Sequence, residues 1–143
     1  MKKILFVCTG NTCRSPMAQA IFAELCQNKE FFADSAGISA SGHSPLSKNA
    51  YLALKKRGIE FSHTSQKVDE QSVAQSFAVI CMTRAHAAAL CSQFPKYADK
   101  IFTFGHDIAD PYGGDCEVYE ACCDELYENV CGLLKELCAE NDR

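Results

Sequence analysis

The sequence predicts an α/β fold in which a parallel β-sheet carries helices on both faces, a flavodoxin-like or Rossmann-like three-layer sandwich. Short apolar runs of strand length alternate along the chain with stretches whose apolar residues recur at helical spacing. The run from Phe77 to Met82 is apolar throughout, which is typical of a strand buried on both faces of a parallel sheet. Helices that connect parallel strands cross over in a right-handed sense and cover the two faces.

In the first half of the chain, an apolar strand over 4–7 precedes a helix over 16–28 that opens at a proline. Three large apolar residues of this helix lie four positions apart and share one face: Met17, Ile21 and Leu25. A short apolar stretch over 31–33 predicts the second strand. The next helix covers 46–57, and Gly58 follows it as a suitable C-terminal cap.

The second half begins with polar residues that contain a short helix from Asp69. The third strand, 77–82, leads into a helix over 83–93 whose first residue is a threonine suited to the N-cap. The fourth strand covers 100–104, and a loop joins it to a long helix over 116–139 with one apolar face. Because strands and helices alternate without repeats or linkers, we expect a single domain over 1–143.

The composition is that of an ordinary globular protein and argues against several classes of function. Of 143 residues, 48% are hydrophobic, and the net charge of −4 comes without a basic cluster larger than residues 55–57. We therefore expect no nucleic-acid partner. No apolar segment reaches transmembrane length, and the N-terminal apolar run ends at Thr9, short of a signal-peptide core. We expect a cytoplasmic protein with no membrane partner.

The ten cysteines would suggest disulfides in a short secreted chain, but several lie on apolar faces of predicted helices, where cysteine acts as a small hydrophobic residue. The sequence has no Cys-x2-Cys pair and no His/Cys cluster at zinc spacing. We therefore expect reduced cysteines, no metal site and no cofactor.

One predicted loop contains a candidate nucleophile and a candidate anion-binding arginine. Cys8 follows the first strand, Arg14 lies six residues later, and Pro16 opens a helix directly behind. The five residues between them let the backbone curl around one phosphate-sized anion, with N–H groups pointing inward and the helix N-terminus adding partial positive charge. Arg14 is predicted to be catalytic together with Cys8, and the other predicted phosphate-binding residues of the loop are Thr9, Gly10, Asn11, Thr12, Cys13 and Ser15.

Residue types in the loop fit this task. Gly10 and Asn11 tolerate backbone conformations that other residues avoid, and the planar guanidinium of Arg14 can bind two oxygens of an anion. The same positive field favours the Cys8 thiolate, to which Ser15 can donate a hydrogen bond. We expect the pKa of Cys8 to fall from about 8.5 into the range of roughly 3.5–7.5, which would make it a nucleophile at neutral pH.

The segment Val-Cys-Thr-Gly-Asn-Thr-Cys-Arg-Ser-Pro, residues 7–16, resembles the signature of the low-molecular-weight protein-tyrosine phosphatases, which open with a Cys-x5-Arg-Ser/Thr loop. Matches over 34–37, 58–63 and 110–112 extend the resemblance to nearly the whole chain. The resemblance implies the strand order 2-1-3-4, where alternation alone leaves other orders open. It also implies hydrolysis of phosphorylated protein side chains through a phosphocysteine intermediate at Cys8.

The resemblance further implies roles for residues outside the loop. Asp110, in Asp-Pro-Tyr, is similar to the family's general acid, which protonates the leaving group and later deprotonates the attacking water. Ser35 and His63 match residues that hydrogen-bond Asn11 and support the loop. From the residues alone, His63 would be an ordinary surface histidine, and two other acids stay open as alternatives: Asp107 and Asp115.

Cys13 lies close to Cys8 across the loop. We expect that oxidation can join the two in a disulfide, which would protect Cys8 from irreversible over-oxidation. The alternative is that Cys13 only packs behind the loop.

Two departures from the tyrosine-specific members concern the substrate. Thr12 stands where those proteins usually have isoleucine, and Ser41 stands where they have an aromatic wall residue. The pattern resembles the bacterial protein-arginine phosphatases of the same family, and a threonine hydroxyl suits a polar guanidino group better than an isoleucine methyl does. Tyr112 can stack on either an arginine or a phenol. We therefore expect a protein-arginine phosphatase, with a protein-tyrosine phosphatase as the alternative.

Two readings from other classes are weaker. A thioredoxin-coupled arsenate reductase shares this fold and loop but needs two further redox cysteines, for which only Cys81 and Cys91 are available, and Cys81 lies inside an apolar strand. A non-catalytic phosphate-binding module would need neither the Cys8 thiolate nor the Asp110 acid.

Overall fold

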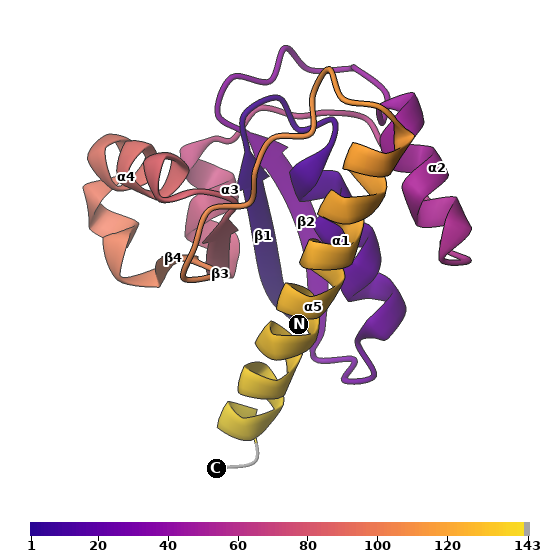
Figure 1. Ribbon diagram of the computed structural model, residues 1–143. Helices are drawn as coiled ribbons and strands as arrows, with labels where there is room; N and C mark the ends of the chain where they lie inside the picture. Colours follow the sequence, from indigo (N-terminus) through magenta and orange to yellow (C-terminus); the bar gives the residue numbers. More distant parts are fainter. Residues whose placement is uncertain (142–143) are drawn as a thin grey trace.

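The computed structural model describes residues 1–141, and within them four parallel strands form one sheet with helices on both faces (Figure 1). The strands are β1 (Lys2–Cys8), β2 (Phe31–Gly37), β3 (Ser76–Cys81) and β4 (Ile101–Thr103). The helices are α1 (Arg14–Leu25), α2 (Lys48–Lys56), α3 (Glu70–Gln75), α4 (Arg84–Gln93) and α5 (Cys116–Asn141), with a 3₁₀ helix over Pro95–Lys100.

The strand order is β2-β1-β3-β4, which confirms the order implied by the family resemblance. β1 is a central strand and is paired on both edges. Because successive side chains of a strand point to opposite faces, β1 contributes to two separate cores. Ile4, Phe6 and Cys8 enter one core, whereas Leu5 and Val7 enter the other.

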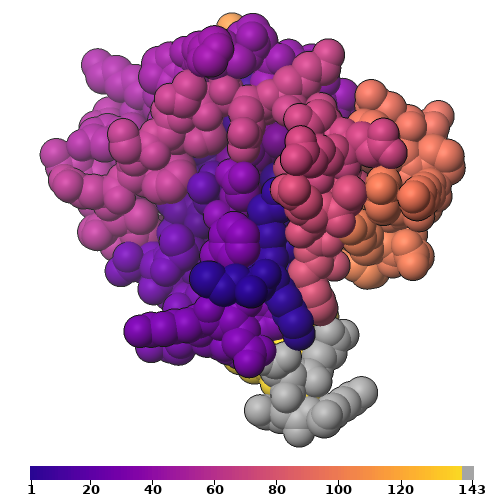
Figure 2. All heavy atoms as spheres, turned by 180° about the vertical axis from the view of Figure 1, so that it is seen from behind, coloured from indigo at the N-terminus to yellow at the C-terminus, as the bar shows by residue number. Residues whose placement is uncertain are grey.

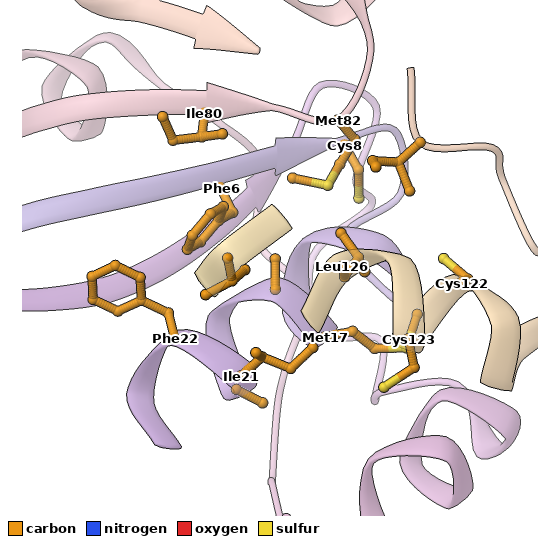
Figure 3. Packing of buried hydrophobic residues seen from close by; sticks show 14 of the residues in the cluster. Phe6, Cys8, Met17, Ile21, Phe22, Ile80, Met82, Cys122, Cys123 and Leu126 are labelled. Atoms are coloured by element: carbon orange, nitrogen blue, oxygen red, sulfur yellow. The ribbon is translucent and has the colours of Figure 1, made fainter. Parts of the chain in front are cut away.

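The first core lies between the sheet and the helices α1 and α5. Phe6 meets Phe22 of α1 edge to face, with ring centroids 5.9 Å apart, and Leu126 of α5 is fully buried beside them. Figure 3 shows Phe6 and Cys8 on the side of β1 that faces α1 and α5. The candidate nucleophile therefore belongs to the larger hydrophobic core.

The second core lies under α3, α4 and the 3₁₀ helix. Val73 of α3 and Leu90 of α4 pack there against Val7 and Val79. In the view from behind, these segments, pink to orange, cover the right-hand side of the molecule (Figure 2). Within residues 1–141, no helix has both the length and the apolar character that crossing a membrane requires.

Most element boundaries differ by one to four residues from the sequence prediction, and three of the differences have a clear physical reason. Helix α1 begins at Arg14 rather than Pro16, which its first turn accommodates because the first N–H groups of a helix need no intrahelical partner. Helix α2 begins at Lys48 rather than at residue 46, because the Ser47 hydroxyl caps it by accepting the N–H of Ala50 at 3.3 Å. Strand β2 continues to Gly37 instead of ending at residue 33, since its polar residues stay in register with β1.

The carboxyl ends of the strands meet at one edge of the sheet, where parallel α/β folds place their sites. Cys8 is opposite Gly37 of β2, and its neighbour Val7 is opposite Cys81 of β3. Gly37 packs directly beneath the loop after β1, because a Cβ atom there would lie 2.6 Å from the carbonyl oxygen of Thr9. The loop thus rests on the end of the neighbouring strand.

Candidate active site

The carbonyl groups of the loop between β1 and α1 point outward. Five of these carbonyl oxygens each accept a hydrogen bond of 2.8 to 3.0 Å from a group outside the loop; they belong to Cys8, Thr9, Asn11, Thr12 and Cys13. The donors are the backbone N–H groups of Ile38, Ser39, Ser47 and Met17 and the ring of His63. Because the C=O and N–H of one peptide unit point in opposite directions, the N–H groups that follow these carbonyls face the interior of the loop. This arrangement has the geometry of a backbone nest at the N-terminus of α1.

Asn11 fixes the shape of the loop. It is fully buried and has a φ of +58°, in the left-handed region that asparagine tolerates. Its side-chain N–H groups donate to the hydroxyls of Ser15 (2.8 Å) and Ser35 (3.0 Å), and its Oδ1 accepts the backbone N–H of Gln66 (2.9 Å). Gly10 and Asn11 were both expected to take backbone conformations that other residues avoid. Asn11 has a positive φ and Gly10 does not.

His63 holds the same residue from the backbone side. Its Nε2 lies 2.8 Å from the Asn11 carbonyl oxygen, and because a carbonyl only accepts, the ring proton lies on Nε2. Burial lowers the pKa of His63. The contacts of Ser35 and His63 with Asn11 are those that the family resemblance implies.

Cys8 lies at the floor of the loop and is 3% exposed. Its sulfur is 2.8 Å from the Ser15 hydroxyl. Since Ser15 accepts a hydrogen bond from Asn11, its own hydrogen can point to the sulfur. Burial raises the pKa of the Cys8 thiol, whereas Ser15, the backbone N–H of Asn11 and the Arg14 guanidinium act to lower it. The pKa of Cys8 is therefore raised and not lowered as expected from the sequence, because the thiol is buried among core residues.

Arg14 spans the site. Its guanidinium, although charged, is 6% exposed at the side chain, and Nη1 donates to the carbonyl oxygen of Ile108 at 2.9 Å. Nη2 donates to Thr9 Oγ1 at 3.4 Å and lies 3.6 Å from a carboxylate oxygen of Asp110. The loop after β4 is thus joined to the loop after β1 through one arginine.

These two loops enclose a pocket of about 260 Å³, large enough for a phosphoryl group and the end of a side chain. Its lining residues are Cys8, Thr9, Gly10, Asn11, Thr12, Cys13, Arg14, Asp110 and Tyr112. Asp110 is half-exposed and accepts the backbone N–H of Tyr112 at 3.1 Å, and the Tyr112 side chain is exposed beside it. Ser41 is exposed and lies outside this lining, 3.4 Å from the Ser44 hydroxyl.

Of the other cysteines named in the sequence analysis, Cys13 lines the pocket, whereas Cys81 does not. Cys13 is buried, and its sulfur contacts the hydroxyls of Ser47 (3.4 Å) and Tyr119 (3.3 Å). Burial raises the pKa of Cys81 to about 12, which suits a structural cysteine rather than a redox relay. Within the part of the chain that the structure describes, no group of three or more His, Cys, Asp or Glu side chains is arranged to hold a metal ion.

Sequence reasoning missed several residues of the site. Gln66 holds Asn11 through its backbone, Gln19 accepts the Ser35 hydroxyl at 2.6 Å, and His86 contacts Thr9 at 2.8 Å. Of these three residues, only Gln66 could have been suggested by the sequence, because it lies three residues after His63. The other two lie on helix faces where a polar residue usually points to solvent.

The fold and this site together define a cysteine-dependent phosphatase. A model of the family described as low molecular weight phosphotyrosine protein phosphatase matches residues 3–143, and the chain belongs to that family.

The relatives of this chain are named for two different substrates, phosphoarginine and phosphotyrosine in proteins. A solved structure of the arginine phosphatase YwlE from Geobacillus stearothermophilus is 39% identical, with 98% of this chain and 95% of that chain covered and a TM-score of 0.94. A second YwlE arginine phosphatase structure, a cysteine-to-serine mutant with a phosphorylated active-site serine, is 37% identical over 94% of this chain and 95% of that chain, with a TM-score of 0.90. The low molecular weight protein-tyrosine-phosphatase PtpB of Staphylococcus aureus is 30% identical, with 95% of this chain and 99% of that protein covered.

Proposed function

We propose that this chain is a protein-arginine phosphatase that forms a phosphocysteine at Cys8 and needs no metal or cofactor. The observation that carries the proposal is that Thr12 lines the same pocket as the nucleophile, the arginine and the acid. Two arginine phosphatase structures are 37% and 39% identical to this chain, and a structure named as a low molecular weight protein tyrosine phosphatase is also 39% identical, so the choice of substrate rests on Thr12 rather than on overall identity. We propose that one domain over residues 1–143 carries this activity.

In the proposed reaction, Cys8 attacks phosphorus as the thiolate, the form that Ser15, the backbone N–H of Asn11 and Arg14 favour, while the bond from phosphorus to the guanidino nitrogen breaks. Asp110 gives its proton to the departing nitrogen, a role supported by its place in the pocket lining, 3.6 Å from Arg14. Asp110 then takes a proton from water as the water oxygen attacks the phosphocysteine, which releases inorganic phosphate and the thiolate. Arg14 and the loop N–H groups stabilise the phosphoryl oxygens in both steps.

Substitution tests these roles. Cys8→Ser should abolish turnover, and Asp110→Asn should lower kcat by about 10²–10⁴-fold, since general acid–base catalysis contributes this much. Asp107→Asn is the matched control, because that carboxylate pairs with Arg84 outside the pocket. A loss in Asp107→Asn equal to that in Asp110→Asn would contradict the assignment of the acid.

The arginine preference is tested by kcat/KM for phosphoarginine and phosphotyrosine peptides on the wild type and on Thr12→Ile. We expect the wild type to prefer phosphoarginine and Thr12→Ile to shift toward phosphotyrosine, because the isoleucine removes a polar partner for the guanidino group. Ser41→Ala serves as the control, since Ser41 lies outside the pocket lining. A wild type that prefers phosphotyrosine would refute the arginine assignment and leave the tyrosine phosphatase.

We also propose that peroxide joins Cys8 to Cys13, which requires Cys13 to leave its contacts with Ser47 and Tyr119. Mass spectrometry that finds Cys8 sulfonate and no Cys8–Cys13 bond would exclude this. A cytoplasmic location is part of the proposal, supported by ten cysteines that are all free within residues 1–141.

A further inference from the structure

One buried histidine lies against the loop without a part in the proposed reaction. His86, on the first turn of α4, is 8% exposed, and both of its ring nitrogens contact threonine hydroxyls. Nε2 lies 2.8 Å from Thr9 Oγ1, and Nδ1 lies 2.9 Å from Thr83 Oγ1. Because Thr9 lines the pocket, His86 is one hydroxyl away from a bound anion.

The hydrogen bonds around Thr9 have a preferred direction. Arg14 Nη2 lies 3.4 Å from Thr9 Oγ1, and a guanidinium can only donate, so Thr9 accepts there. Thr83 Oγ1 accepts the backbone N–H of His86 at 3.1 Å and has its own hydrogen to give to Nδ1. In the tautomer with the ring proton on Nε2, Thr83 donates to Nδ1 and His86 donates to Thr9.

With two hydrogen bonds accepted, the Thr9 oxygen has used both lone pairs, and its own hydrogen stays available. Burial lowers the pKa of His86, Arg14 adds to this lowering, and Asp110 and Asp107 oppose it. The neutral ring has a single proton, which lies on Nε2 in the arrangement proposed below.

We propose that His86 is a positioning residue that holds Thr9 so that the Thr9 hydroxyl donates to a phosphoryl oxygen in the loop. This inference rests on the proposed function only in that the loop binds a phosphoryl group. It assigns the loop a side-chain donor in addition to Arg14 and its backbone N–H groups.

The test measures the Kd of inorganic phosphate by NMR titration. Thr9→Val removes the hydroxyl at similar size and should weaken phosphate binding about 10-fold or more, as expected for a hydrogen bond to a charged group. His86→Asn should weaken binding to a similar extent, because its shorter amide cannot reach Thr9. His86→Gln, whose amide nitrogen can take the place of Nε2, should stay within about threefold of the wild type. The exposed His106→Asn is the matched control.

The double variant Thr9→Val/His86→Asn decides whether the histidine acts through the threonine. We expect it to bind phosphate no more weakly than Thr9→Val alone. Losses that multiply in the double variant, an unchanged Kd in Thr9→Val, or a His86→Gln as weak as His86→Asn would each overturn the proposal. The Thr9→Val result stands even where a change at the buried His86 prevents folding.

The two proposals fail in different ways. A wrong substrate assignment leaves these phosphate affinities as expected, because phosphate has neither an arginine nor a tyrosine part. A wild type that does not bind phosphate would instead refute the proposed function itself.

Discussion

Asn11 combines several tasks in one buried side chain. It adopts a left-handed backbone conformation, directs Ser15 toward the nucleophile, and receives support from Ser35, His63 and Gln66. These partners come from α1, from β2 and from the segment between α2 and α3. The loop therefore keeps its shape through contacts made on folding, and binding an anion requires little reordering.

His63 makes the stability of this arrangement depend on pH. Because burial lowers the pKa of His63 below its ordinary value of about 6.5, the unfolded chain takes up a proton at a pH where the folded chain does not. The free energy of unfolding should fall as pH drops below about 6.5 and should level off below the folded pKa. Urea unfolding of the wild type and His63→Gln between pH 5 and 7.5 measures this.

His63→Gln keeps a donor for the Asn11 carbonyl but does not titrate, so its stability should depend less on pH than that of the wild type. Burial also lowers the pKa of His86, so the free energy of unfolding should still depend on pH to some extent in both proteins. The exposed His106→Gln is the control and should follow the wild type. Parallel pH profiles for the wild type and His63→Gln would contradict the expectation.

Among single residues, the sequence predicted those whose chemistry is evident from type and spacing. Cys8, Arg14 and Thr12 all line the pocket, because five residues between a strand and a helix leave few paths for the chain. It did not predict that Ser41 lies outside the pocket lining or that burial raises the pKa of Cys8. Both depend on how distant segments pack, which spacing along the chain does not determine.

For the helices and strands, the local sequence predicted the type of each element more accurately than its first and last residues. Thr83 caps α4 through its side chain, as predicted, and the short helix predicted from Asp69 is α3, which begins at Glu70 with Asp69 as its N-cap. The residues after position 33 have the composition of a turn, yet they form the end of β2, because pairing with β1 outweighs local preference. Tertiary pairing of this kind is not visible in a single segment.

Leucines on two helices test the division into core and surface. Leu126 of α5 is fully buried, and Leu126→Ala should lower the free energy of unfolding by about 2–5 kcal/mol through lost burial and a cavity. Leu52 of α2 is 39% exposed, and Leu52→Ala should cost less than about 2 kcal/mol. Urea unfolding followed by circular dichroism compares the two, and equal losses would contradict this account of the core.

On the scale of the whole molecule, the site joins the first strand to the first helix. β1 lies between two neighbouring strands, α1 packs on α5, and Cys8 is part of the core between them. The strand order was predictable through the family resemblance, since alternation of strands and helices leaves several orders open. The two-sided burial of β1 follows from that order.

Activity and structure should therefore be lost together in urea. We expect the midpoint for loss of activity to coincide with the midpoint from circular dichroism, because the loop has no path to open without moving β1 or α1. Leu126→Ala should move both midpoints by the same amount. Loss of activity at a clearly lower urea concentration would show that the loop melts separately.

Gly37 has a consequence for the interpretation of mutational scans. Any side chain at this position meets the Thr9 carbonyl oxygen, so even alanine would displace the loop that holds the nucleophile. A saturation scan scored by activity would rank Gly37 beside Cys8 as intolerant, although glycine has no group that reacts or binds. Intolerance in such a scan would mark the space that the loop requires as well as the atoms that perform the chemistry.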